Sequence, residues 1–188
     1  MRWSALYARS RQVPASAAVV LLVAAAVWLF DRGGPADLGT VVLALTANVV
    51  AGSVGLGGPD VVLERTAAIR WAPRRAAHVL LIGAAAGAAL LAVRAAGGQL
   101  APVEVVVRDS AGLVGLAALG AVLCGAQFAW ALPTGWLGFT VLVPTPDGRV
   151  GEVAKWMLFP PGTAASTATA AALLVTGTLL YAVAGPRQ

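Results

Sequence analysis

The hydrophobic residues of this chain form a series of long runs that contain almost no charged side chains. A run of about 20 apolar residues crosses the hydrocarbon core of a bilayer as one α-helix. Inside lipid, a helix satisfies every backbone N–H and C=O group within its own segment. We therefore predict an all-α integral membrane protein, a helix bundle that forms one transmembrane domain over residues 1–188. The predicted spans are 14–30, 38–56, 76–96, 110–130, 131–145 and 162–183.

The number of spans depends on residues 110–143, which form either one bent helix or a hairpin that turns at Pro133-Thr134-Gly135. A single helix of 34 residues would be about 51 Å long, whereas the hydrocarbon core is about 30 Å thick. Six spans are therefore favoured over five. With six spans and the N-terminus inside, eight of the 13 basic residues lie on the cytoplasmic side, as the positive-inside rule requires. Five spans satisfy the same rule, so charge does not decide the number.

Composition supports the membrane prediction, since 59% of the residues are hydrophobic and only 11% are charged. The net charge of +5 does not indicate nucleic-acid binding, because the basic residues flank apolar runs instead of forming a soluble basic face. Almost all of them are arginine, which is typical of a GC-rich bacterial genome, so we expect the bacterial cytoplasmic membrane. Cys124 is the only cysteine, which excludes an internal disulfide and favours a small, buried packing residue.

The sequence contains no set of residues that indicates catalysis or a cofactor. It has no glycine-rich phosphate-binding loop for ATP, and a single histidine, His78, together with a single cysteine cannot form a metal cluster. The turn Gly52-Ser53-Val54-Gly55 follows an alanine, so it lacks the spacing of a serine nucleophile motif. We therefore predict neither an enzyme nor a bound cofactor or metal.

Polar residues within the predicted spans are few. Asp109 is interpreted as the start of a helix, where a carboxylate caps free N–H groups. No acidic residue then lies in the middle of a span, and this disfavours a proton-coupled carrier. Asn48 and Gln127 are the remaining polar candidates. Each either bonds a neighbouring helix or lines a translocation path.

The most polar internal segment, residues 57–75, separates the second and third spans. Asp60 can cap a short helix over residues 60–70, and Pro73 would end it. Such a helix on the cytoplasmic side is either a docking element for a soluble partner or an interfacial anchor without one. Residues 3–11 also form an amphipathic segment, which we expect to lie in the membrane interface.

This layout resembles the transmembrane subunit of ABC-2-type exporters. The stretch Leu63-Glu64-Arg65-Thr66-Ala67-Ala68, the following Arg74-Arg75-Ala76-Ala77-His78, and Arg108-Asp109 ahead of a glycine-leucine span resemble small actinobacterial ABC transporter permeases. As a layout, the resemblance covers most of the chain. It implies an interfacial N-terminal helix at 3–11, a cytoplasmic coupling helix at 60–70 and a re-entrant outer loop at 147–161.

The resemblance also implies partners. ATP would be hydrolysed on a separate ATP-binding cassette subunit, and a second membrane subunit would complete a homodimer or heterodimer. The expected ATPase contacts are Asp60, Glu64, Arg65 and Arg70. The residues expected to dip into the outer leaflet are Trp156, Met157 and Phe159. The alternative is an accessory or regulatory membrane subunit without its own translocation path. This alternative explains the short length of the chain equally well.

Overall fold

A computed structural model describes residues 13–30, 37–57, 71–98 and 100–187 of the chain. Within these ranges every regular element is helical, which confirms the predicted all-α class. The α-helices are α2 (Val13–Phe30), α3 (Leu38–Ser53), α5 (Trp71–Ala95), α6 (Val103–Leu123), α7 (Ala131–Leu142), α8 (Gly148–Ala154) and α9 (Ala164–Ala184). The short 3₁₀ turns are η2 (Val54–Leu56), η3 (Ala126–Phe128) and η4 (Trp156–Leu158). The predicted interfacial segment 3–11 and the coupling segment, with Asp60, Glu64, Arg65 and Arg70, lie outside the described residues.

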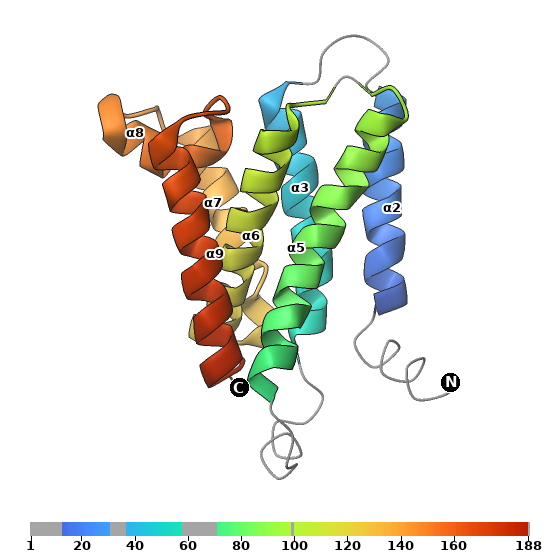
Figure 1. The fold of residues 1–188 in the computed structure, drawn as a ribbon, viewed down its shortest axis with the longest axis vertical. Coiled ribbons are helices and arrows are strands. Elements are labelled where there is room, and N and C mark those ends of the chain that lie inside the picture. The colour runs from blue at the N-terminus through green and yellow to red at the C-terminus, as the bar shows by residue number, and fades with distance from the viewer. Residues whose placement is uncertain (1–12, 31–36, 58–70, 99, 188) are drawn as a thin grey trace.

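The helices α2, α3, α5, α6, α7 and α9 run alternately up and down in one bundle, with α8 at its upper end (Figure 1). We call the end that carries α8 and the start of α6 the upper end, and the end that carries the end of α6 and the C-terminus the lower end. The helix α2 begins at the lower end, α3 ends there and α5 begins there. The described residues on either side of 58–70, Gly57 and Trp71, therefore both lie at the lower end.

The helix α6 lies at the centre of the bundle and packs against α3, α5, α7 and α9. Over its most apolar stretch, 78% of the residues are buried. Glycines allow the closest approaches, as small residues do between helices in lipid. A Cβ at Gly83 would lie 2.8 Å from Val114 of α6. Gly115 of α6 and Gly177 of α9 bring the two backbones into direct contact.

Four helical segments are long and apolar enough to cross a membrane. They are Leu38–Leu56, Trp71–Ala95, Val103–Leu123 and Ala164–Ala184. The apolar helix Pro14–Leu29 is shorter, and the 12 residues of α7 extend only about 18 Å. Six spans were predicted, whereas the described residues form seven α-helices and four helical segments reach membrane length.

Three details differ from the sequence-based expectation. The helix α6 begins at Val103 rather than near residue 110, so Asp109 lies within the helix and does not cap it. The chain reverses at 124–130, whereas Pro133 lies in the first turn of α7, where a missing N–H costs nothing. Cys124 is exposed at the end of α6 instead of buried.

Candidate functional site

Arg108 is a buried arginine in the second turn of α6, and it holds the segment that precedes the last helix. Its side chain is 5% exposed. The Nε group donates a hydrogen bond of 2.8 Å to Asp109 Oδ1, and the pair forms a salt bridge. The remaining guanidinium nitrogens donate to three backbone carbonyls: Phe159 O at 3.0 Å, Pro160 O at 3.3 Å and Met157 O at 3.4 Å.

These contacts offset the free-energy cost of burying the positive charge of Arg108. A planar guanidinium group offers five N–H donors in a fixed fork, and here the fork serves one carboxylate and three carbonyls. Asp109 balances the charge and is fully buried. Removing one member of such a pair leaves an uncompensated buried charge, which costs about 3–5 kcal/mol. Arg108 therefore fixes residues 157–160 against α6.

Trp156 inserts into the bundle one helical turn below Arg108. Its side chain is completely buried and lies on Gly112, where an added Cβ would overlap the indole ring. Gly112 is four residues after Arg108, so both residues occupy the same face of α6. Trp156 Nε1 and Asp109 Oδ2 are buried without a hydrogen-bond partner among the described residues. The glycine thus creates the space that the indole fills.

Two further side chains hold α8 at the upper end. Trp136 Nε1 of α7 donates to Ala154 O at 3.0 Å, and Ser166 Oγ of α9 donates to Glu152 O at 3.0 Å. Together with Arg108 of α6, these contacts attach the segment between α7 and α9 to three helices. We call residues 147–161 the re-entrant segment, because α8 projects at the upper end (Figure 1) and the chain then turns back so that Trp156 and Met157 are buried in the bundle.

The outer-leaflet contact expected for Trp156 and Met157 is not what the structure shows. Both side chains are fully buried within the protein, so neither contacts lipid. Phe159 is only partly buried, although its carbonyl is bound by Arg108. The three residues are therefore brought together, but as an inward-facing anchor of the re-entrant segment.

The two polar residues singled out within the spans occupy different environments. Asn48 is buried in α3, and both atoms of its amide are without a partner among the described residues. Gln127 lies in the turn η3 at the lower end, where it is exposed. The structure does not bring these two residues to one site.

Ser53, from the turn that lacks the spacing of a nucleophile motif, and His78, the single histidine, both contact backbone carbonyls. Ser53 Oγ donates to Val50 O at 2.7 Å, and His78 Nε2 lies 3.1 Å from Gly55 O. In the described part of the chain, no group of three His, Cys, Asp or Glu side chains is arranged to hold a metal ion.

Arg108 was not predicted as a site residue, because the sequence pattern places it in a loop and Asp109 at the start of a helix. The residue that could have indicated the true start of α6 is Pro102. Proline is favoured at the start of a helix, and here it is the N-cap of α6. A helix that begins after Pro102 places Arg108 and Asp109 in its second turn, inside the bundle.

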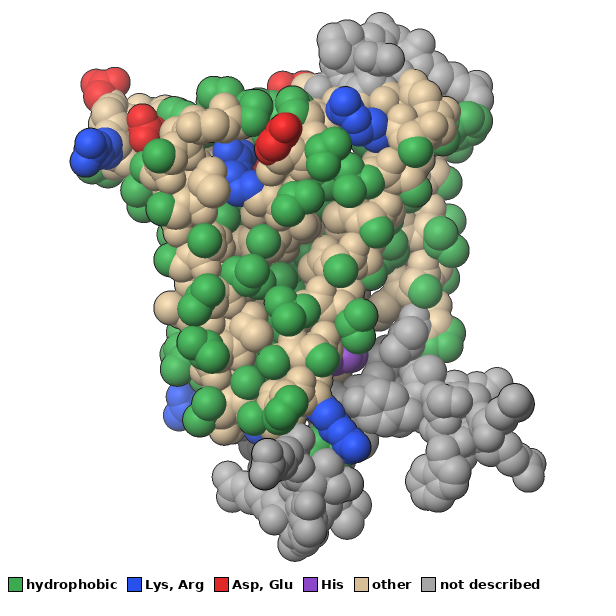
Figure 2. Space-filling view, viewed as in Figure 1, with side chains coloured by type: hydrophobic (Ala, Val, Ile, Leu, Met, Phe, Trp, Pro, Cys, Tyr) green, Lys and Arg blue, Asp and Glu red, His purple; other side chains and the backbone are tan. Residues whose placement is uncertain are grey.

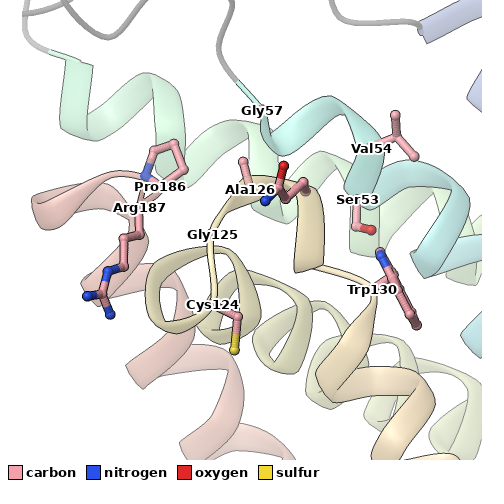
Figure 3. A pocket seen from close by; sticks show the side chains of 10 residues that line it. Ser53, Val54, Gly57, Cys124, Gly125, Ala126, Trp130, Pro186 and Arg187 are labelled. Carbon is pink, nitrogen blue, oxygen red and sulfur yellow. The ribbon is translucent and has the colours of Figure 1, made fainter.

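A cavity of about 430 Å³ opens at the lower end (Figure 3). It lies between the end of α3 with η2, the turn 124–130, and the C-terminal residues Pro186 and Arg187. Gln127 is one of its lining residues. A second cavity of about 480 Å³ lies at the upper end between α7 and α8, away from the buried Trp156. The two cavities differ in their lining, since the lower one includes Ser53, Gln127 and Arg187.

No protein-family model, characterised protein or solved structure matches this chain.

Proposed function

We propose that this chain is a transmembrane permease subunit of an ABC-type exporter, located in the bacterial cytoplasmic membrane with its N-terminus inside. The observation that carries the proposal is the re-entrant segment 147–161, which lies between α7 and α9 in the chain, buries Trp156 and Met157 and is fixed by Arg108. The ABC-2-type layout has a re-entrant outer loop at this position. The four membrane-length helices support the membrane setting.

The direction of the helices adds support for a coupling role of residues 60–70. Because α3 ends and α5 begins at the lower end, the connection 58–70 is anchored at the end opposite the re-entrant segment. This is the relation that an exporter needs between a cytoplasmic coupling helix and an outer loop. Figure 2 shows acidic side chains near the upper end of this face and basic side chains at both ends. The described acidic residues belong to the upper end, whereas the described basic residues divide between the upper end, with Arg94, Arg108, Arg149 and Lys155, and the lower end, with Arg74, Arg75 and Arg187.

ATP would be hydrolysed by a partner subunit. Glu64, Arg65 and Arg70, with Asp60 at the start of the segment, would contact that subunit, and closure of the ATPase would be transmitted to α3 and α5. A translocation path would form between two membrane subunits. Within one copy, the direct contact of Gly115 and Gly177 leaves no passage between α6 and α9.

The same contact favours a second candidate, an accessory membrane subunit that has no path of its own. The side chains of α6 are used for helix packing, since 78% of its apolar stretch is buried. This candidate predicts one copy of the chain beside a larger permease, whereas the permease proposal predicts that the chain itself lines the path as one of two similar subunits.

The test is a mild-detergent pull-down of the tagged full chain, followed by mass spectrometry and an ATPase assay. We expect a stoichiometric ATP-binding cassette partner that is lost when Glu64→Arg and Arg65→Glu are combined. The matched control reverses Arg149→Glu and Glu152→Arg on α8, at the opposite end, and should retain the partner. Recovery of the chain alone, without ATPase activity, would contradict the proposal, and the subunit ratio separates a permease from an accessory subunit.

A further inference from the structure

The cavity at the upper end is a groove between the second half of α7 and one side of α8, with a volume of about 480 Å³. All of its lining residues lie within residues 100–187, a range that the structure describes without a gap. They are Trp136, Phe139, Arg149, Val150, Val153 and Ala154. The groove therefore offers apolar surface together with a single cation.

The walls of this groove are held in place by contacts within the protein. Trp136 Nε1 donates to Ala154 O at 3.0 Å, which joins α7 to the end of α8. The rings of Trp136 and Phe139 meet edge to face, with their centroids 6.3 Å apart. On α8, Val150, Val153 and Ala154 follow the helical spacing of three and four residues, so they share one face. The groove is therefore preformed, as small-ligand sites usually are.

The surface around the groove suits acyl chains. Beyond Phe139, the last turn of α7 carries Val141 and Leu142, which are 67% and 82% exposed. Val150 and Val153 of α8 are exposed as well. An exposed apolar patch of this kind marks a site of interaction with a membrane or another apolar partner. In the membrane setting that the four long helices support, the nearest apolar material is lipid.

The charges beside the groove have both signs. Arg149 is exposed and forms no hydrogen bond or ion pair within the described part of the chain. Two carboxylates lie close to it in the sequence, since Asp147 is the N-cap of α8 without a side-chain capping bond and Glu152 comes one helical turn after Arg149. Figure 2 shows acidic and basic side chains together at the projecting tip that α8 forms. A complementary ligand therefore carries a negative group for Arg149 and a positive group for the carboxylates.

We propose that this groove binds one phospholipid whose zwitterionic head group carries a primary ammonium, as in phosphatidylethanolamine. One acyl chain would lie against Trp136, Phe139 and Val153. The phosphate would accept hydrogen bonds from Arg149, whose planar fork matches its geometry, and the ammonium would donate to Glu152 or Asp147. The inference rests on the membrane insertion contained in the proposed function, and it is independent of any ATPase partner.

Native mass spectrometry of the full chain tests this proposal, because the mass of a retained lipid identifies its class. The protein would be placed in bilayers of equal parts phosphatidylethanolamine and phosphatidylglycerol, and then transferred into mild detergent. We expect one retained phosphatidylethanolamine per chain, favoured about two- to fivefold over phosphatidylglycerol, which is the scale of one exposed charge pair. Glu152→Gln should reduce this preference, and Arg149→Gln should lower the retention of both lipids.

A second pair of variants tests the acyl-chain site. Val153→Trp fills the groove and should lower retention about tenfold, the scale of two methylene groups that lose apolar contact. Leu179→Trp is the matched control, since Leu179 of α9 is an exposed hydrophobic residue outside the groove, and it should leave retention unchanged. Val150→Trp replaces Val153→Trp if that variant fails to fold.

Absence of a retained lipid, or equal retention by Val153→Trp and Leu179→Trp, would overturn the proposal. Equal or greater retention of phosphatidylglycerol would overturn the head-group assignment. A dimer that Val153→Trp dissociates would assign the groove to a second copy of the chain and overturn the lipid assignment. A chain that does not enter bilayers would contradict membrane insertion itself, whereas a chain that retains its lipid but has no ATPase partner would contradict only the proposed transport role.

Discussion

The two ends of α6 are held by different kinds of contact. At the upper end, one side chain, Arg108, binds a carboxylate and three carbonyls, and Trp156 fills the space over Gly112. At the lower end, the C-terminal segment is attached by backbone hydrogen bonds through Arg187 and Ala126, beside an open cavity. The upper end is therefore held mainly by one buried guanidinium group with several bonds, whereas the lower end is held by single bonds from several groups, which include backbone N–H groups and the Tyr181 hydroxyl.

This difference predicts which substitutions should lower the free energy of unfolding. An end that depends on one guanidinium group should fail when that group is removed. An end that depends on single bonds from several groups should lose less from any one substitution. Three substitutions test this contrast, from the centre of the upper end to a single hydroxyl at the lower end.

Arg108→Ala should have the largest effect. It leaves Asp109 as an unpaired buried charge and removes the donors of three carbonyls, so the free energy of unfolding should fall by about 3–5 kcal/mol. Denaturant unfolding in detergent, followed by tryptophan fluorescence, measures this. The exposed Arg149→Ala should change the free energy of unfolding by less than about 0.5 kcal/mol. Equal effects of the two substitutions would show that Arg108 does not hold the upper end.

Gly115→Ala should come next, because the added methyl group would overlap the backbone of α9 at Leu173. Overpacking of this kind costs about 1–3 kcal/mol. The matched control is Gly138→Ala in α7, where a Cβ meets nothing within 4 Å. Replacing a helical glycine by alanine there should stabilise the protein by about 0.5–1 kcal/mol. Thermal unfolding should thus shift in opposite directions, and a shift in the same direction would contradict the close contact of α6 and α9.

Tyr181→Phe should have the smallest effect of the three. Tyr181 Oη of α9 donates a buried hydrogen bond of 2.6 Å to Leu56 O at the lower end. Its loss should lower the free energy of unfolding by about 1 kcal/mol. Thr176→Val removes a hydroxyl from the exposed face of the same helix, and it serves as the control in the same unfolding assay. A cost for Tyr181→Phe as large as that of Arg108→Ala would reverse the comparison of the two ends.

Two helices without charged residues could be predicted closely from the sequence. The observed α2 (Val13–Phe30) and α9 (Ala164–Ala184) differ by one or two residues from the predicted ranges 14–30 and 162–183. In both, a long run without charged side chains between polar or turn-forming residues is a local property of the sequence. The coupling segment 60–70 lies outside the described residues and stays a prediction.

The start of α6 and the candidate site could not be predicted in the same way. The β-branched run around Val105 and Val106 favours an extended strand locally, yet both side chains are completely buried in a helix. Their burial, like the position of Trp156 over Gly112, depends on segments far apart in the sequence. Periodicity describes one helix at a time, so it carries no information about such pairs. The turn at Gly125 was missed for a related reason, because Pro133 offered a stronger local signal.

The distance along the chain between Arg108 and its carbonyl partners has a consequence for how the protein is made. These partners lie 49 to 52 residues later in the sequence. Ribosomes add about 5–20 residues per second, so Arg108 is synthesised several seconds before Met157, Phe159 and Pro160. During that interval, its adjacent residue Asp109 is the one partner from the finished site that already exists. On the proposed insertion into a membrane, α6 enters the bilayer with this charge already paired, and the carbonyl contacts form when the end of the chain arrives.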